Sequence, residues 1–567
     1  MTESMQNDAR PPRSYEAEFS FIVQPTLLDP WIEDELNEQQ ASMANATSEL
    51  DPEGMIRLLS SRCEPASSHE PELAPLPEVM LDFALQCLQN NEHGDGQLFA
   101  HLFRKRCIYD PGVANWYLWR GHYWEEDWRA YTRLLISGPL ASVYQKASTI
   151  VSKQPEAGNA QGGEEVTITP RQSRQLGLRA DQLRSLTRSD HVMRYASTLV
   201  AVETKVWDAN PWVLGTRQGA IDLRTGRLRA GLPDDYIRTI IPTAWKGLKE
   251  PAPRFERFLR EIFDDRPEDE REELIAFLQR ALGYGITGSV NEHIFLMLYG
   301  EEGRNGKDTL MHVLAHVLGR TVGAVSEDVL IAGGRFSMPG TAKPHLCSLQ
   351  GKRIAWASEP GRGAHFAVNQ IKLLTGGETI VARQLYGKEF TFQPSHLLIL
   401  LTNHKPEADS SDRAFWERLC PITFNIRFVE KPERSNERLR DTNLARELKE
   451  EASGILAWLV RGALDWNDFG LAIPSSVRRA REEYRNEESN ISDFVQESCL
   501  LEAEAQVPAN MLYKRYKTWS VENALEPVGP KHFAQEIRQV DGVTCQRNRR
   551  GKVYVGITLA QHAHEDD

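Results

Sequence analysis

Hydrophobic residues recur along this chain with two different periods, and the changes of period mark the predicted elements. Residues 294–299 (IFLMLY), 352–358 (KRIAWAS) and 396–401 (HLLILL) are short apolar runs, which predict buried β-strands. After the first run, apolar positions spaced three and four apart predict a helix that opens at Lys307, and a second helix covers residues 368–374. Strands alternating with helices predict an α/β fold for this central part of the chain.

Upstream, the pattern is that of a smaller α+β domain. Helices are predicted over residues 80–88 and 94–106, and the aromatic stretch 115–128 alternates around a glycine turn, which predicts a β-hairpin. Its aromatic rings could stack nucleic-acid bases, but packing within the hairpin is the interpretation we favour. Residues 152–177 have the composition of a linker, and we expect an exposed loop there between two helices.

Downstream, an amphipathic helical pattern covers residues 444–466, a charged helical connector covers 477–494, and two more helices are predicted over 511–519 and 531–540. Two strand-like runs then flank a basic turn, and residues 531–552 hold six Lys/Arg against two Asp/Glu. We interpret this end as a winged-helix domain whose turn contacts DNA phosphates, with a solvated hairpin as the alternative. The candidate DNA-binding residues here are Arg547, Arg549, Arg550 and Lys552.

With 567 residues, the chain is long enough for three or four domains. We expect an acidic, largely disordered arm over residues 1–75 and an α+β domain over 76–250. The central α/β domain is expected over 251–470, and a connector helix with the winged-helix domain over 471–567.

The net charge of −13 comes almost wholly from the first 80 residues, which hold 16 Asp/Glu and 4 Lys/Arg. The nearly balanced remainder leaves room for basic patches that bind DNA. We interpret the acidic arm as a solvated tail, or alternatively as a segment that binds a replication partner or mimics DNA. The chain has no apolar run of about 18 residues and no signal-peptide pattern, so we expect no membrane association. Seven scattered cysteines without a CxxC fit a reducing compartment and argue against a zinc site.

The most informative stretch is residues 298–310, LYGEEGRNGKDTL, in which a strand runs into a glycine-rich turn and then a helix. Such a loop can turn its backbone N–H groups toward phosphate oxygens, while its lysine reaches the outer phosphates. The spelling departs from the usual P-loop, because five residues separate Gly300 from Gly306 and Asp308 stands where Ser or Thr is expected. Either Asp308 or Thr309 could therefore attend Mg²⁺. The candidate nucleotide-binding residues are Gly300, Gly303, Arg304, Asn305, Gly306, Lys307, Asp308 and Thr309.

Polar side chains follow the other predicted strands. Glu359 comes directly after the second strand, where a carboxylate could hold Mg²⁺ or polarise water. Asn403 follows the third strand and could touch the γ-phosphate or orient the attacking water, with a loop cap as the alternative. Arg418 ends a short helix and is a candidate to stabilise transition-state charge across a subunit interface. Residues 379–392 predict a β-hairpin with Lys388 at or near its tip.

Together these motifs resemble the superfamily 3 helicases, and more narrowly the ATPase module of the poxvirus and phage/plasmid primase–helicase family. The upstream segments ANWYLWRGHYWEEDW and QGAIDLRTGRL are similar to the region that precedes the ATPase in that family. The motifs that carry the resemblance, in chain order, are GRNGKDT, WASE, IKLLTGGETIVARQLYGKEF, LLTNHKP and DRAFWERLCPITF.

The resemblance implies an AAA+ type α/β ATPase that uses ATP and Mg²⁺, assembles as a homo-oligomeric ring, usually a hexamer, and moves along single-stranded or forked DNA. It also implies a role for each matching residue. Gly303, Asn305, Gly306 and Lys307 would bind the phosphates. Glu359 would be the Walker B acid, Asn403 sensor 1 and Arg418 the arginine finger. Lys388 would reach DNA in the pore, and Lys372 lies between Walker B and sensor 1.

The function we expect is therefore that of an ATP-dependent, ring-forming DNA helicase that acts in the replication of a phage, plasmid or integrated mobile element, in the cytoplasm of a bacterial host. Two alternatives stay open. One is an origin-binding initiator whose ATP site drives assembly, and the other is a primase–helicase. Only about 80 residues precede the shared region, so we expect no priming by this chain alone.

Overall fold

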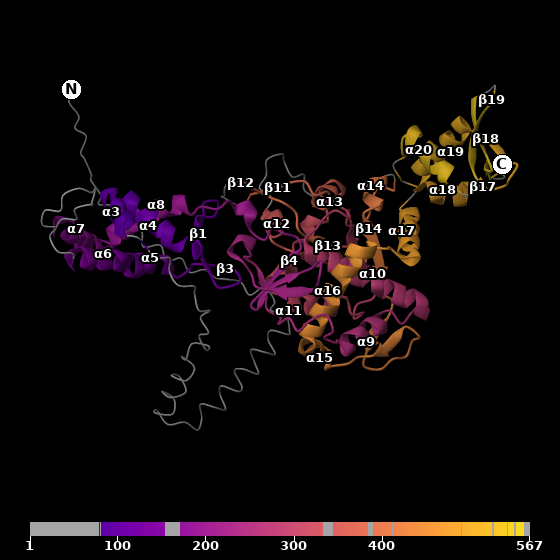
Figure 1. Cartoon of the computed structure of the whole chain (residues 1–567). Coiled ribbons are helices and arrows are strands. Elements are labelled where there is room, and N and C mark those ends of the chain that lie inside the picture. Colours follow the sequence, from indigo (N-terminus) through magenta and orange to yellow (C-terminus); the bar gives the residue numbers. More distant parts are fainter. Residues whose placement is uncertain are drawn as a thin grey trace, which may run out of the picture. The chain divides into compact units, whose positions relative to one another are not determined.

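The structure is a computed structural model with a mixed α/β fold (Figure 1). The acidic arm at 1–75 lies outside the residues that it describes, as do Lys388, Arg549 and Arg550. None of the described helices combines the length and apolar composition needed to cross a bilayer. The described residues are 79, 81–153, 170–332, 344–383, 389–410, 412–488, 490–523, 525, 527–540, 542–548 and 551–560.

The centre of the fold is a five-stranded parallel sheet with the strand order β14-β8-β13-β10-β9. The three predicted strands are confirmed as β8, β10 and β13. Because the strands are parallel and in register, the residues that follow β8, β13 and β10 all emerge at the same edge of the sheet. The strands are β8 Phe295–Tyr299, β9 Val322–Ala324, β10 Ile354–Ser358, β13 Leu397–Thr402 and β14 Leu419–Thr423.

Helices cover both faces of this sheet, which explains why its strands are continuously apolar. In β8, Leu296 and Leu298 pack into the core on one face, whereas Phe295 and Met297 pack into the core on the other. The first face is covered by α9 Pro253–Ile262, α10 Glu268–Thr287, α11 Lys307–Leu318 and α16 Ala452–Phe469 (Figure 1). The second is covered by α12 Pro344–Cys347, α13 Val368–Thr375 and α14 Arg413–Trp416.

Smaller elements surround the sheet. The hairpin predicted over residues 379–392 is confirmed as an antiparallel pair, but its tip, 384–388, lies outside the described residues. A short parallel pair follows β14, and one further helix leads into α16. These elements are β11 Ile380–Arg383, β12 Glu389–Phe392, β15 Arg427–Val429, β16 Glu437–Leu439 and α15 Leu444–Glu450.

The upstream region combines helices with two small sheets. The aromatic hairpin is confirmed as β2–β3, and Trp124 is 1% exposed, so packing within the protein accounts for this ring. The expected loop at 152–177 is wrong in its last part, because residues 170–182 form α7. Buried Leu176 and Ala180 hold that helix to its core, a spacing of four that the polar composition obscured.

The bounds of these upstream elements are as follows. The helices are α3 Leu81–Gln89, α4 Asn91–Phe103, α5 Tyr131–Leu135, α6 Ala141–Lys153, α7 Pro170–Gln182 and α8 Leu186–Leu199. The strands are β1 Cys107–Asp110, β2 Asn115–Trp119, β3 Trp124–Glu126, β4 Val213–Thr216, β5 Gly219–Asp222, β6 Arg227–Arg229 and β7 Ile240–Ile241.

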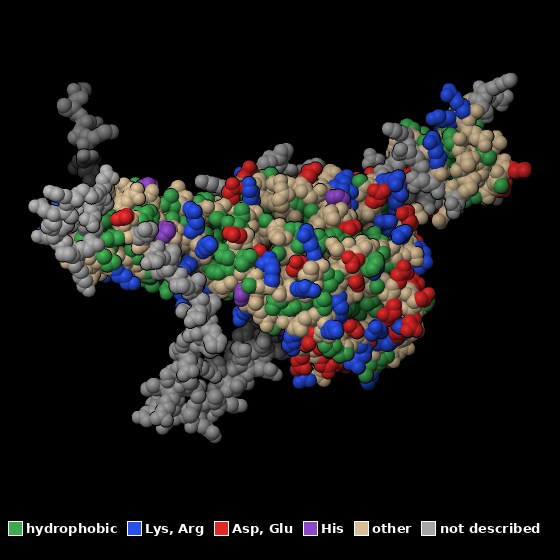
Figure 2. Space-filling model, in the orientation of Figure 1, with side chains coloured by type: hydrophobic (Ala, Val, Ile, Leu, Met, Phe, Trp, Pro, Cys, Tyr) green, Lys and Arg blue, Asp and Glu red, His purple; other side chains and the backbone are tan. Residues whose placement is uncertain are grey.

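The C-terminal unit packs helices against a three-stranded antiparallel sheet, around a core that includes Phe494, Tyr516 and Phe533. Arg547 and Lys552 are exposed and face each other across β19 and β20, and Figure 2 shows Lys and Arg side chains on this unit. Helix α17 Ser475–Glu487 packs on the central sheet and leads into this unit. The elements of the unit are α18 Asn490–Ser498, β17 Cys499–Leu500, β18 Gln506–Pro508, α19 Ala509–Glu522, α20 Pro530–Glu536, β19 Thr544–Asn548, β20 Gly551–Val555 and β21 Thr558–Leu559.

Candidate nucleotide-binding site

The glycine-rich loop, residues 300–306, joins β8 to α11 and depends on glycine at one position above all. Gly306 has a φ of +91°, a backbone conformation that residues with a Cβ rarely adopt. A Cβ there would stand 2.6 Å from the Cγ2 of buried Ile262 in α9. Gly303, by contrast, faces open space. The shape of the loop next to α11 is therefore set by its close approach to α9.

Asn305 supports this loop from inside. Its side chain is buried, and Nδ2 donates to the carbonyl of Glu302 at 2.8 Å and to that of Phe424 at 3.4 Å. The backbone N–H of Phe428 donates to the carbonyl of Arg304 at 2.8 Å. The side chain of Asn305, predicted to meet phosphate, is thus engaged in fastening the loop to the chain that follows β14.

Lys307 is the first residue of α11 and is 4% exposed. Its Nζ donates to the carbonyls of Gly300 at 3.3 Å and Thr402 at 3.2 Å, and to Oδ1 of Asn403 at 2.8 Å. Burial lowers the pKa of Lys307 to about 8, although the nearby carboxylates of Asp308 and Glu359 favour the charged form. The site therefore holds a poorly solvated ammonium group that an anion would stabilise.

Glu359 and Asn403 reach the same edge of the sheet from neighbouring strands. Asn403 follows β13 and accepts the hydrogen bond from Lys307. Glu359 follows β10, is exposed, and has a φ of +55°, while its N–H donates to the carbonyl of Leu401 at 3.0 Å. A left-handed backbone at a non-glycine residue costs energy, and residues in this conformation are enriched at functional sites.

Two further residues whose side-chain oxygens could bind a metal ion lie in the first turn of α11. The carboxylate of Asp308 is exposed, and Thr309 is partly buried. Hydroxyl and carboxylate oxygens are the ligands that Mg²⁺ accepts in proteins, so both residues and Glu359 suit the ion chemically. Whether Asp308 or Thr309 attends the metal stays a prediction.

Arg418 and Lys372 lie at the opposite edge of the sheet from Lys307. The carbonyl of Arg418 accepts from the N–H of Phe295, the first residue of β8, and its Nε donates to Oγ1 of Thr375 at 3.1 Å. Lys372 pairs with Asp412 at 2.8 Å. Five residues of strand, roughly 13 Å, separate this edge from the glycine-rich loop. Within one chain, neither residue joins the cluster around Lys307.

The structure also shows charged contacts at the loop that the sequence patterns did not reveal. Both carboxylate oxygens of Glu302 are paired, one with Arg427 at 3.2 Å and the other with Arg434 at 3.1 Å. These arginines stand more than a hundred residues downstream, and no periodicity or motif links them to the loop. They bring positive charge to the side of the loop that faces β15.

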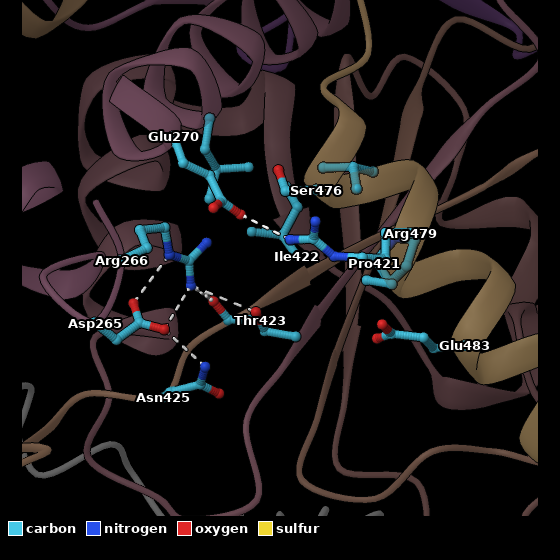
Figure 3. Close-up of a pocket in the computed structure, with 13 residues that line it drawn as sticks. Asp265, Arg266, Glu270, Pro421, Ile422, Thr423, Asn425, Ser476, Arg479 and Glu483 are labelled. Atoms are coloured by element: carbon cyan, nitrogen blue, oxygen red, sulfur yellow. Dashed lines mark hydrogen bonds and ion pairs between the residues drawn. The ribbon is translucent and has the colours of Figure 1, made fainter. Parts of the chain in front are cut away.

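A cavity of about 310 Å³ lies beside the edge strand β14, between the segment that precedes α10 and the start of α17. Figure 3 shows Arg266, Asp265 and Asn425 joined at one side, and Glu270 paired with Arg479 at 3.2 Å. The cavity is polar, but none of the predicted site residues lines it.

Comparison with known protein families places three matches along the chain. The profile described as D5 N terminal like matches residues 96–264, and the one described as Poxvirus D5 protein-like matches 487–555. A family of unknown function matches 298–418, which spans the glycine-rich loop, Glu359, Asn403 and Arg418.

Curated relatives come from large DNA viruses. "Putative helicase L207/L206" of Acanthamoeba polyphaga mimivirus is 28% identical over 67% of this chain and 40% of that protein. "Putative helicase 121R" of Invertebrate iridescent virus 3 is 23% identical over 55% and 35%, and "Putative primase C962R" of African swine fever virus is 23% identical over 40% and 24%. The chain spans less than half the length of these relatives.

These relatives are proteins of viruses that infect eukaryotes, so they do not support the expected bacterial host. Among solved structures, "The apo structure of NrS-1 C terminal region (305-718)" is 13% identical, with a TM-score of 0.39 over 80% of this chain and 96% of that one. The resemblance to the poxvirus-type family rests on the sequence matches, which confirm it.

Proposed function

We propose that this chain, which matches two D5-like family models and putative helicases of large DNA viruses, is a Mg·ATP-dependent DNA helicase of superfamily 3 that acts as a ring in DNA replication. The observation that carries the proposal is the meeting of Lys307, Asn403 and Glu359 at one edge of a parallel sheet. A buried ammonium, an amide and a carboxylate in this arrangement suit a nucleoside triphosphate and its metal.

Each residue has a distinct task in the proposal. Lys307 gives up its carbonyl acceptors and neutralises the outer phosphates, while Asn403, released from Lys307, aligns the attacking water. Glu359 takes the proton of that water or holds the metal, with Asp308 or Thr309 beside it. Mg·ATP supplies the phosphoanhydride bond whose hydrolysis drives movement along DNA.

The strand order supports an AAA+ type core. The strand that delivers Asn403, β13, lies between the loop-bearing strand β8 and the acid-bearing strand β10. Arg418 stands at the far edge of its own sheet, which suits an arginine that completes the site of a neighbouring subunit. Single-stranded or forked DNA would meet the hairpin at Lys388, and DNA phosphates would meet Arg547 and Lys552 in the C-terminal unit, which we assign as a winged helix.

The direct test is ATP hydrolysis and forked-duplex unwinding by Lys307→Ala. We expect hydrolysis to fall about a hundredfold or more, because a preorganised charge at the phosphates is lost. Lys246→Ala is the matched control, since Lys246 is exposed and pairs locally with Glu250. Mass measured with and without nucleotide shows whether a ring forms. Equal hydrolysis by Lys307→Ala and Lys246→Ala would refute the proposal.

The trans role of Arg418 is tested by mixing two inactive variants. Lys307→Ala retains its arginine and Arg418→Ala retains its lysine, so a mixed ring contains some complete sites. We expect the mixture to recover part of the hydrolysis that each variant lacks alone. Full activity of isolated Arg418→Ala contradicts the assignment.

A second candidate is primer synthesis, favoured by the name of the relative C962R as a primase. That match covers only 24% of the relative. Incorporation of ribonucleotides on a single-stranded template tests it. An ATP site that serves assembly at an origin, without unwinding, is distinguished by the absence of strand displacement on a forked substrate.

A further inference from the structure

Helix α17 holds the loop that carries Asn403, which we call the Asn403 loop (residues 403–410). The hydroxyl of Tyr484 donates to the carbonyl of Pro406, and Nε of Arg485 donates to the carbonyl of Ser410 at 2.7 Å. The N–H of Ala408 donates to Oε2 of Glu488, just beyond the helix, at 3.0 Å. Three backbone groups of the loop are therefore satisfied by side chains from one helix and its end.

Lys405 ties this contact to the glycine-rich loop. Its ammonium pairs with Glu487 and lies over two aromatic rings, 5.5 Å from the centre of Tyr299 and 5.2 Å from that of Tyr484. Tyr299 is the last residue of β8 and directly precedes the glycine-rich loop. This cation of the Asn403 loop thus contacts both the strand that precedes the glycine-rich loop and α17, and attraction to the ring faces favours its position.

The centre of the contact is buried, whereas Glu487 at its rim is exposed. Tyr484 is 1% exposed and packs edge-on against Trp416, with the ring centres 5.1 Å apart. Glu488 is half-buried, and its burial raises the pKa of its carboxyl group. Polar groups withdrawn in this way are stable only in the geometry that satisfies them. The Asn403 loop and α17 are therefore expected to move together.

The same helix leads into the C-terminal unit. Residue Asn490 begins α18, two residues after Glu488. Arg485, which binds the carbonyl of Ser410, also pairs through Nη2 with Glu536 of α20 at 3.4 Å, and both side chains are largely withdrawn from water. One arginine therefore contacts the Asn403 loop and the unit that carries Arg547 and Lys552.

We propose that Lys405 and Tyr484 are positioning residues for Asn403, and that α17 couples DNA on the C-terminal unit to the nucleotide site. The inference rests on the proposed function, because Asn403 acts there on water and on Lys307. Movement of α17 would shift Asn403 relative to Lys307, whose ammonium it accepts at 2.8 Å. The helix would thus make hydrolysis depend on DNA without any direct contact between DNA and nucleotide.

Hydrogen–deuterium exchange of the full chain tests the coupling. We expect a non-hydrolysable ATP analogue to slow exchange in the glycine-rich loop, the Asn403 loop and α17 of the wild type. In Lys405→Met and Tyr484→Phe, which keep the length or the ring, the glycine-rich loop should stay protected while α17 no longer responds. Lys246→Met, at an exposed lysine, should behave as the wild type.

Steady-state kinetics of ATP hydrolysis distinguish coupling to DNA from a purely structural effect of the substitution. In Tyr484→Phe, we expect the DNA-stimulated kcat for ATP to fall by about fivefold or more, the lower end of ordinary coupling between sites, with KM for ATP unchanged. Wild-type protection of the glycine-rich loop without any response in α17 overturns the coupling and leaves the proposed function intact. Absence of protection in the glycine-rich loop overturns both.

Discussion

Replacing Gly306 by alanine tests whether α9 sets the shape of the glycine-rich loop. The new methyl group would lie 2.6 Å from Cγ2 of Ile262 and 3.3 Å from a ring carbon of Phe258. Ile262 is fully buried, so it has no free space into which it can turn. The loop, or the helix beneath it, must shift instead.

The magnitude follows from two separate costs. A left-handed backbone at an alanine costs roughly 1–2 kcal/mol, and an extra methyl group in a packed core typically costs about 1–3 kcal/mol. We therefore expect Gly306→Ala to lower the free energy of unfolding by about 2–5 kcal/mol. Because the loop is displaced from Lys307, binding of a fluorescent ATP analogue should be lost as well.

Gly303→Ala is the matched control, since that position has open space around it and no left-handed φ. Its unfolding free energy should stay within about 0.5 kcal/mol of the wild type. Urea unfolding followed by tryptophan fluorescence measures both variants. Combining Gly306→Ala with Ile262→Ala should cost less than the sum of the single changes, because the second removes the clash but not the backbone strain. Equal stability of the two glycine variants would refute the reasoning.

Two further predictions concern pH. Since burial holds the pKa of Lys307 near 8 and bound phosphate would restore its charge, ATP affinity should weaken about tenfold per pH unit above 8, a slope that titration calorimetry measures and that Lys307→Arg should lack. His396 is buried, neither of its ring nitrogens has a hydrogen-bond partner among the residues that the structure describes, and burial lowers its pKa to about 4. Above the unfolded-state pKa near 6.5, this histidine is neutral in both the folded and the unfolded protein. As pH falls from there toward 4, the unfolded protein binds a proton that the folded protein does not, so the free energy of unfolding decreases. Relative to His396→Leu, the wild type should lose about 2 kcal/mol between pH 7.5 and 5 in urea unfolding; an equal loss in both proteins contradicts the assignment.

The sequence predicted the sheet well because its strands are covered on both faces, and such strands are apolar without interruption. Because the ends of such strands are clear in the sequence, the polar residues that follow them can be predicted to lie together. The structure brings Lys307, Glu359 and Asn403 to one edge of the sheet. The ion pairs of Glu302 with Arg427 and Arg434 could not be predicted, because ion pairs between distant segments produce no periodic pattern in the sequence.

Other features escaped prediction for related reasons. The contact of α17 with the Asn403 loop joins residues about 80 positions apart through backbone carbonyls, which any residue type supplies. The sequence favours a loop at the start of α7 because polar side chains there outnumber Leu176 and Ala180, the buried apolar residues that hold the helix. Arg418 immediately precedes β14, which runs parallel to β8, so it lies at the end of the sheet away from Lys307. The spacing of residues in the sequence does not show the direction of a strand.

The order of strands in the sheet has a consequence for how the protein is made. Phe295 of β8 pairs with Leu398 on one side and with Leu419 on the other, so the ribosome adds more than a hundred residues before either neighbour exists. Until then both edges of β8 are open, and contacts of such high sequence separation form slowly. A chain stopped before about residue 425 would present an apolar, unpaired strand, which invites aggregation. Successful synthesis therefore depends on protecting this strand until its last partner has been made.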